Sequence, residues 1–182
     1  VKNCRTLQPA CVIPVHAGIE IYTHSEKVRE ARKTIISLLL SDHKNECFSC
    51  PKNGNCELQN LAEKYTVNAD HFISILKNVK TDDSSPSLYK DNSKCIKCQR
   101  CVRTCTDLQA LSVWTMAHKG FEVSVESFMD KPLNEVVCAN CGQCINRCPT
   151  GALVEKRCID TVWKSINNSK KHVVVQTAPA TR

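Results

Sequence analysis

The sequence predicts an α+β protein whose fold is organised by metal, and three observations support this prediction. The chain has 182 residues and contains 14 cysteines. Eight of them form two runs with the same internal spacing, C-x-x-C-x-x-C-x-x-x-C. Segments with helical periodicity alternate with short segments typical of strands and turns. Small cysteine-rich domains without a large apolar core usually fold around metal, so we expect the metal-free chain to be poorly structured.

The two runs have the spacing of bacterial two-cluster ferredoxins, in which three cysteines of one run hold a [4Fe–4S] cluster and the fourth ligates the other cluster. We therefore pair Cys95, Cys98 and Cys101 with Cys148, and Cys138, Cys141 and Cys144 with Cys105. Disulfides and zinc ribbons are weaker alternatives. Three thiols spaced two residues apart suit a loop around one metal centre, whereas zinc ribbons use separate C-x-x-C pairs. Two such clusters would carry single electrons.

Other elements follow in chain order. Residues 1–22 are interpreted as strand and turn. Thr23 and Glu26 have the spacing of a capping box, and the helix that it begins is predicted to end near Asp42 or His43. A shorter helix is expected from Glu57 to Tyr65. Residues 77–94 are polar and rich in turn formers, so we interpret them as a linker or an extended crossing.

Between the cysteine runs, alternation predicts a hairpin with strands at residues 111–114 and 121–125 around Lys119 and Gly120. Residues 159–168 are predicted to be helical, with one apolar stripe. The stripe consists of Ile159, Val162, Trp163 and Ile166. The valines at 173–175 indicate a strand without a partner in the chain, which suggests that another domain follows Arg182.

A third group of potential ligands precedes the two runs. His43, Cys47, Cys50 and Cys56 have the spacing H-x-x-x-C-x-x-C-x-x-x-x-x-C. Three cysteines need a fourth donor, and His43 is the nearest one in the sequence. A third [4Fe–4S] cluster is one interpretation, and zinc bound by one histidine and three cysteines is the competing one. An imidazole in place of a thiolate should raise the reduction potential of a cluster.

The formal charge of +7 could suggest nucleic acid as a partner. A [4Fe–4S] core with four thiolates adds about −2, and one with an imidazole about −1. Three such clusters would lower the charge to about +2, so we expect no nucleic-acid partner. Several basic residues among the cysteines could dock an acidic carrier or adjust a potential, or form a solvated face. These are Lys94, Lys97, Arg100, Arg103 and Arg147.

The chain also resembles a known family. The His43 motif followed by twin ferredoxin runs resembles the N-terminal accessory iron–sulfur region of [FeFe]-hydrogenases, the iron-only hydrogenase large subunits. Residues 7–11 (LQPAC) resemble the end of that family's plant-type [2Fe–2S] β-grasp domain. Residues 130–138 (DKPLNEVVC), 141–144 (CGQC) and 172–180 (HVVVQTAPA) resemble further parts, the last one the first strand of the catalytic domain. The resemblance covers essentially the whole chain.

The resemblance implies three [4Fe–4S] clusters, and a [2Fe–2S] cluster only if sequence precedes Val1. Cys11 matches the last of four [2Fe–2S] ligands and would be an orphan here, while Cys4 lies too close to it to fit. Cys158 matches no ligand, and we interpret it as a buried structural thiol. The family's catalytic cysteine motifs would lie beyond Arg182, so no catalytic residue is expected in this chain and its own hydrogenase activity should be nil.

The expected domains are a [2Fe–2S] remnant over 1–22, a helical His/Cys cluster domain over 23–76, a linker over 77–87, a two-cluster ferredoxin-like domain over 88–168 and the start of a catalytic domain over 169–182. The implied function is electron relay between ferredoxin or an NAD(P)H-oxidising flavoprotein and a hydrogen-activating site outside the chain.

Two alternatives remain open. One is the iron–sulfur subunit of an NAD-linked formate dehydrogenase or a complex I-like NADH dehydrogenase, and the other is a non-enzymatic zinc-binding interaction module. No apolar run is long enough to span a membrane, since Ser37 interrupts the longest one at Ile35–Leu40. No secretory signal is visible, although an upstream targeting segment stays possible. Heavy thiol use favours a reducing, low-oxygen compartment, either the cytoplasm or an anaerobic organelle such as a hydrogenosome.

Overall fold

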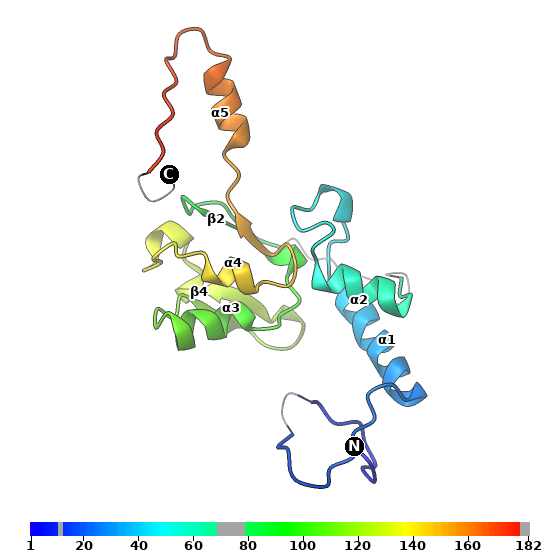
Figure 1. Ribbon diagram of the computed structural model, residues 1–182. Helices are drawn as coiled ribbons and strands as arrows, with labels where there is room; N and C mark the ends of the chain where they lie inside the picture. The colour runs from blue at the N-terminus through cyan, green and yellow to red at the C-terminus, as the bar shows by residue number, and fades with distance from the viewer. Residues whose placement is uncertain (11–12, 69–78, 179–182) are drawn as a thin grey trace.

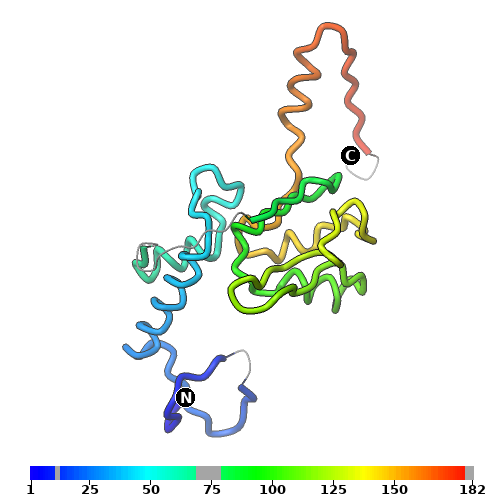
Figure 2. Tube along the Cα trace, turned by 180° about the vertical axis from the view of Figure 1, so that it is seen from behind, coloured from blue at the N-terminus to red at the C-terminus, as the bar shows by residue number. Residues whose placement is uncertain are grey.

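The computed structural model describes residues 1–10, 13–68 and 79–178. A helical lobe lies beside a lobe that contains both cysteine runs, and the two are visible from opposite sides in Figures 1 and 2. The N-terminal loop lies at the far end of the helical lobe. The C-terminal helix and the segment after it project away from the sheet lobe (Figure 1).

The helical lobe is built from α1 (Glu26–Ser41) and α2 (Glu57–Tyr65). Apolar residues on their facing sides form its small core, which consists of Ile36, Leu40, Cys56 and Leu58. The predicted capping box is wrong. Ser25 is the N-cap, without a side-chain cap, and the Thr23 hydroxyl lies 2.7 Å from Nδ1 of His24 instead. The N-cap therefore lies two residues after the expected one, and the helix begins at Glu26, close to the predicted span.

The sheet lobe contains two antiparallel sheets. In the first, β2 (Leu88–Asp91) lies between β1 (Thr81–Asp82) and β5 (Leu153–Glu155). The second is the hairpin of β3 (Trp114–Ala117) and β4 (Ser124–Ser127).

Short helices follow the two cysteine loops. They are α3 (Arg100–Arg103), continued by the π-helical turn η4 (Thr104–Leu108), and α4 (Gln143–Arg147). The described residues also contain single 3₁₀ turns: η1 (Cys47–Ser49), η3 (Asn92–Lys94), η5 (Gly120–Glu122), η6 (Phe128–Asp130) and η7 (Leu133–Glu135).

Strands β1 and β2 arise from the segment that we interpreted as a linker or an extended crossing. Leu88 is fully buried, but Lys90 and Asp91 are buried as well. Their polarity hides the alternation that would have identified a strand. This stretch therefore belongs to the folded lobe, and Lys90 pairs with Leu153 of β5 across the sheet.

The predicted hairpin exists, but both strands begin three residues later than expected. Ala110 and Ser112 have positive φ, so the chain turns through residues 110–112 before β3 starts. The backbone N–H of Leu111 donates to the carbonyl of Cys105 instead of to a neighbouring strand. Leu111 and Val113 therefore line the cavity that Cys105 shares with the second cysteine run.

Neither predicted strand at the chain ends is present in the described residues. The N-terminal loop is closed by an ion pair of 2.8 Å between Lys2 and Glu20. Helix α5 (Ile159–Ile166) forms as predicted, yet its apolar stripe is exposed and the valines at 173–175 form no strand. Within the described residues, no helix has the length and apolar character needed to cross a membrane.

Candidate metal centres

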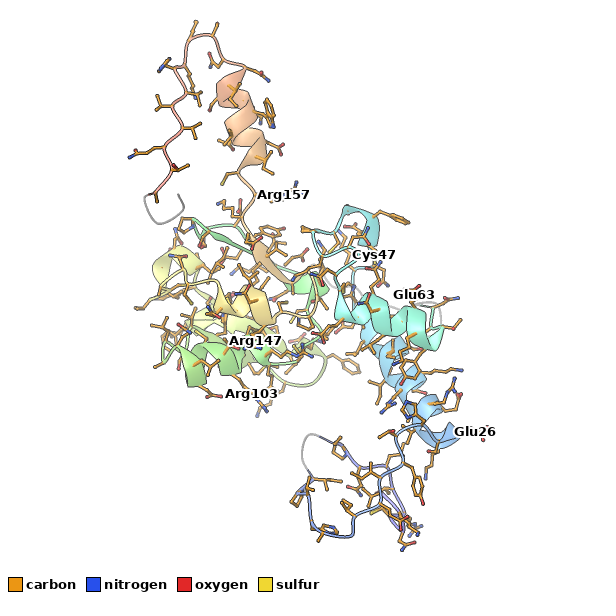
Figure 3. The ribbon with its side chains drawn as sticks, in the orientation of Figure 1. Glu26, Cys47, Glu63, Arg103, Arg147 and Arg157 are labelled. Carbon is orange, nitrogen blue, oxygen red and sulfur yellow. The ribbon has the colours of Figure 1, made fainter. Side chains whose placement is uncertain are left out.

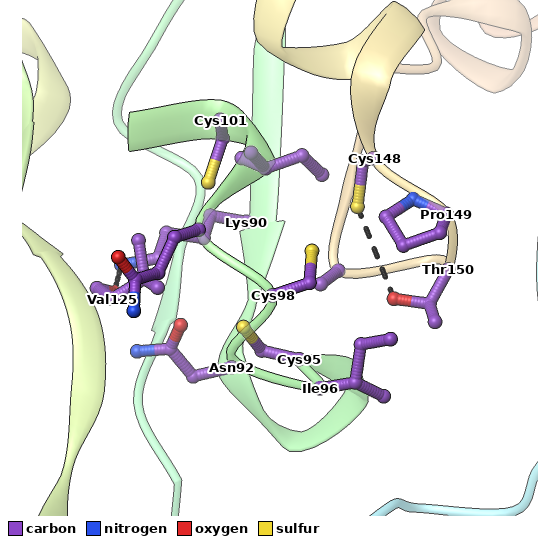
Figure 4. Close-up of a pocket in the computed structure, with 13 residues that line it drawn as sticks. Lys90, Asn92, Cys95, Ile96, Cys98, Cys101, Val125, Cys148, Pro149 and Thr150 are labelled. Atoms are coloured by element: carbon purple, nitrogen blue, oxygen red, sulfur yellow. Dashed lines mark hydrogen bonds between the residues drawn. The ribbon is translucent and has the colours of Figure 1, made fainter. Parts of the chain in front are cut away.

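The structure brings four thiols from both cysteine runs to one cavity. Cys95 and Cys98 come from the loop before α3, Cys101 lies in the first turn of α3, and Cys148 is at the C-terminal end of α4. Figure 4 shows their four sulfurs directed into a common space. This space has a volume of about 380 Å³, counting its open mouth. The fold thus brings together the four cysteines that the spacing predicts to share one cluster, and we call this cavity site 1.

A second cavity repeats the arrangement with the roles of the runs exchanged. Cys138, Cys141 and Cys144 line it together with Cys105, which η4 carries. Its volume is about 320 Å³ on the same measure. Leu88, Val113 and Trp114 form apolar walls around it. We call this site 2.

The backbone of the two loops shows why this spacing suits a wrapped metal group. Lys97 and Gln99 in the first run have φ values of 56° and 62°. Asn140 and Gly142, at the equivalent positions of the second run, have φ values of 52° and 72°. These left-handed residues reverse the chain between successive cysteines. Sulfurs two residues apart can therefore all point into the loop.

Backbone and side-chain donors lie close to the sulfurs. The N–H of Lys97 lies 3.4 Å from Sγ of Cys95, and the N–H of Val113 lies 3.3 Å from Sγ of Cys105. Trp114 donates a hydrogen bond to the sulfur of Cys144. Such donors stabilise thiolate charge and tune the potential of an iron–sulfur group.

Without metal, burial favours the protonated form of Cys95, Cys101 and Cys144. Burial, and then the charge of Cys95 and the other neighbouring thiolates, raise the pKa of Cys101 to about 12. Burial also raises the pKa of Cys95 and of Cys144 above the ordinary value. A buried group of thiolates is stable only with a compensating positive charge, which a metal group provides. The donor set and the cavity size therefore fit a four-thiolate cluster.

His43 lies at the C-terminal end of α1 and is buried, with 7% of its surface exposed. Its Nδ1 lies 3.3 Å from Oδ1 of Asn45, whereas Nε2 is buried and has no partner among the described residues. Because an amide oxygen can only accept, Nδ1 donates and Nε2 carries the lone pair. Burial lowers the pKa of His43, which keeps the imidazole neutral. A histidine held in this way suits metal ligation.

The three cysteines that accompany His43 lie in the same lobe. Cys47 begins the turn η1 and Cys50 ends it, in the loop that joins the two helices (Figure 3). Cys56 is the N-cap of α2 and is buried. We call this group the His43 site.

Contacts between the lobes lie next to the ligand candidates. Glu57, beside Cys56, accepts two bonds of 2.5 and 2.8 Å from Arg100, beside Cys101. Lys97 pairs with Asp42, which precedes His43. Ile96 packs against the helical core and also lines site 1. The His43 site and site 1 are therefore held against each other.

Three of the five basic residues near the cysteines form ion pairs, and two do not appear among the ion pairs of the described residues. Lys97 and Arg100 tie the lobes together, and Lys94 pairs with Asp91 at 3.0 Å. Arg103 on α3 and Arg147 on α4 are exposed (Figure 3). A docking or solvated face thus remains an interpretation for these last two alone.

The remaining cysteines lie apart from the three sites or outside the described residues. Cys158 is exposed and precedes α5, so its interpretation as a buried thiol is wrong. Cys4 is exposed in the N-terminal loop. Cys11, the expected orphan [2Fe–2S] ligand, lies outside the described residues. In the part of the chain that the structure describes, no three His, Cys, Asp or Glu side chains are grouped to hold a single metal ion.

Two family models match the parts of the chain that carry these sites. Residues 32–71 match the iron–sulfur binding region of NADH-ubiquinone oxidoreductase-G. Residues 85–154 match the ferredoxin-like domain of NADH-quinone oxidoreductase subunit 3. The first range contains the His43 site, and the second contains both cysteine runs. The chain thus carries [4Fe–4S] binding regions of the kind found in electron-transporting iron–sulfur proteins.

Curated relatives belong to hydrogenases and to NADH dehydrogenases. The NADP-reducing hydrogenase subunit HndD of Solidesulfovibrio fructosivorans is 41% identical over all of this chain, which spans 31% of that protein. An NADH-quinone oxidoreductase protein of Rhizobium meliloti, the G 2 subunit, is 31% identical over 85% of the chain, or 18% of its own length. The chain therefore spans less than a third of either relative.

A solved structure shares the fold. The NAD⁺-reducing [NiFe]-hydrogenase in its H₂-reduced state is 27% identical, with a TM-score of 0.77 over 82% of this chain and 64% of its own. The resemblance to [FeFe]-hydrogenases thus finds support at a coarser level, that of hydrogenase and NADH dehydrogenase subunits. The two groups are not separated by these matches.

Proposed function

We propose that this chain is the electron-transfer part of an NAD(P)H-linked hydrogenase, with three [4Fe–4S] clusters. Site 1, site 2 and the His43 site would each hold one cluster. Electrons would pass between ferredoxin or an NAD(P)H-oxidising flavoprotein and a hydrogen-activating site outside these 182 residues. The observation that carries the proposal is the exchange of the fourth thiol between runs, which places Cys148 in site 1 and Cys105 in site 2.

The chain's own residues would hold, shield and tune these groups. An iron–sulfur cluster supplies reversible one-electron uptake when it is bound. Leu88, Val113 and Trp114 would exclude water from site 2. The N–H groups of Lys97 and Val113 would donate to ligand sulfurs. These contacts stabilise the anionic form and limit reorganisation when the charge changes.

The geometry also supports a continuous path. Trp114 contacts site 2 and lies under the side chain of Lys90, which lines site 1. Ile96 lies between site 1 and the helical core that includes Cys56. The sites would thus follow in the order His43 site, site 1, site 2. Such an order suits a relay of electrons along the chain.

A complex I-like NADH dehydrogenase is the second candidate, favoured by the two family matches. The 41% identity to a hydrogenase subunit, which extends over all 182 residues of this chain, favours the first candidate. The chemistry inside this chain would be the same in both, namely electron relay. What differs is the reaction at the end of the relay.

Metal analysis tests the proposal against a zinc-binding module. We expect anaerobically purified chain to be brown and to contain about twelve iron and about twelve acid-labile sulfide. Colourless protein with stoichiometric zinc would refute the iron–sulfur proposal. Replacing Cys105 with serine should perturb only the cluster of site 2, because Cys105 lines that cavity. Cys158→Ser is the matched control and should leave all clusters unchanged, because Cys158 is exposed and lies outside both cavities.

A further inference from the structure

Lys90 is a cation buried beside site 1. Only 8% of its surface is exposed, and it lines the cavity together with the four cysteines of that site (Figure 4). Its Nζ donates to the carbonyl oxygen of Val125 and lies 4.9 Å from the ring centroid of Trp114. Both contacts fix the ammonium in place, and the aromatic face favours its positive charge.

The ammonium of Lys90 is surrounded by acidic groups that act on it from a distance, Glu126 and Asp130 among them, but it has no direct ion-pair partner among the described residues. Within the described residues, no carboxylate forms an ion pair with Lys90, whereas Lys94 nearby pairs with Asp91 at 3.0 Å. Burial lowers the pKa of Lys90, and negative charge at Cys95, then at Glu126 and Cys101, opposes that effect. A buried cation without a directly paired anion is costly, so an anionic group in site 1 would stabilise the ammonium further.

The two cavities differ in this respect. The residues described as lining site 2 include no lysine or arginine. Site 2 has apolar walls and receives the Trp114 hydrogen bond at Cys144. Two clusters with the same four-thiolate ligation would therefore face different fields. A fixed positive charge favours the more negative, reduced form of a nearby group and so raises its potential.

We propose that Lys90 is a positioning residue that sets the potential of site 1, raising it through its buried positive charge while leaving site 2 largely unaffected. The inference rests on the proposed function, since it requires clusters in both sites. It assigns Lys90 an electrostatic role that β-sheet packing alone would not require. The twin sites thereby become unequal steps of one relay.

The experiment is a redox titration monitored by electron paramagnetic resonance on the intact, anaerobically purified chain. Three variants are compared with the parent: Lys90→Met, Lys90→Arg and Lys156→Met. Lys156 is the matched control, because it also donates to backbone carbonyls, of Asp83 and Ser85, but lines neither cavity. Replacing Cys98 with serine identifies the signal of site 1.

We expect Lys90→Met to shift the potential of site 1 downward and to shift site 2 less. Lys90→Arg should restore the site 1 potential, and Lys156→Met should leave both sites unchanged. Loss of iron from site 1 in Lys90→Met but not in Lys90→Arg would support the same role. Unchanged potentials in Lys90→Met, or equal effects of Met and Arg, would overturn it. A parent chain without iron would instead refute the proposed function.

Discussion

The sulfur of Cys50 lies 2.5 Å from the position that a β-carbon would occupy on Gly151. Gly151 belongs to the segment that follows Cys148 and Pro149, so this contact joins the His43 site to the segment that closes site 1. The N–H of Glu57 donates to the carbonyl of Pro149 at 2.9 Å in the same region. The absence of a side chain at position 151 therefore sets how closely the two lobes approach.

Gly151→Ala should displace Cys50 and perturb the His43 site. The added methyl group has no room, and overpacking of this kind typically costs about 1–3 kcal/mol. We expect the signal of the His43 cluster to change or to be lost, with sites 1 and 2 retained, as measured by iron content and electron paramagnetic resonance. Gly120→Ala controls for backbone strain alone, because a β-carbon there meets nothing within 4 Å while the φ of 58° strains the residue locally in the hairpin loop. Unchanged spectra in Gly151→Ala would refute this role of the glycine.

His43→Cys should keep a cluster in the His43 site and lower its potential, because a thiolate replaces a neutral imidazole and adds negative charge. Asn45→Ala should reduce cluster retention in the His43 site, because it removes the side chain that orients the imidazole. Asn45 accepts from Nδ1 and also donates to the carbonyl of Leu40 at 3.1 Å. Spectroelectrochemistry measures both effects. If neither the spectrum nor the potential changes in His43→Cys, His43 is not a ligand.

The Glu57–Arg100 pair should fasten the lobes without contributing much stability. Its side chains are about half exposed, so we expect a coupling energy of about 0.5–1 kcal/mol from a double-mutant cycle of thermal unfolding. Glu57→Gln should also make iron in the His43 site easier to remove by a chelator. The exposed pair of Lys80 and Asp130 is the control, since it should show similar coupling without this iron loss. If Asp130→Asn caused the same iron loss as Glu57→Gln, the Glu57–Arg100 pair would have no specific role in fastening the lobes.

Cluster retention should rise with pH. The raised pKa of Cys101, about 12, favours the protonated thiol, and ligation releases that proton. A fall in pH therefore favours the metal-free, protonated site. We expect a chelator to extract iron more slowly at about pH 9 than at about pH 7. Extraction rates measured anaerobically by absorbance would test this, and faster extraction at the higher pH would contradict it.

Sequence spacing predicted which thiols share a cavity, because each run has the spacing of two-cluster ferredoxins, in which the fourth cysteine serves the other site. The same reasoning could not find β1 and β2, since burial of Lys90 and Asp91 conceals the strand pattern. It also placed the hairpin too early, because the apolar residues before Trp114 pack against a cavity instead of a strand.

The roles of Gly151 and Lys90 were beyond sequence analysis for a different reason. Gly151 matters through a contact with Cys50, which lies 101 positions earlier in the chain. Lys90 matters because Trp114 and Val125 from the hairpin hold its ammonium beside the cysteines. Only the folded arrangement shows that these residues adjoin metal sites. In the sequence, neither Gly151 nor Lys90 belongs to a motif that indicates a metal site.

A stoichiometric reductive titration of the intact chain tests the central claim, that the chain holds a relay of three iron–sulfur clusters. Under anaerobic conditions we predict reversible uptake of about three electrons per chain, one for each site. Electron paramagnetic resonance should resolve a signal that His43→Cys alters and two that Cys98→Ser and Cys105→Ser alter separately. A chain that carries metal yet takes up no electrons would contradict the account.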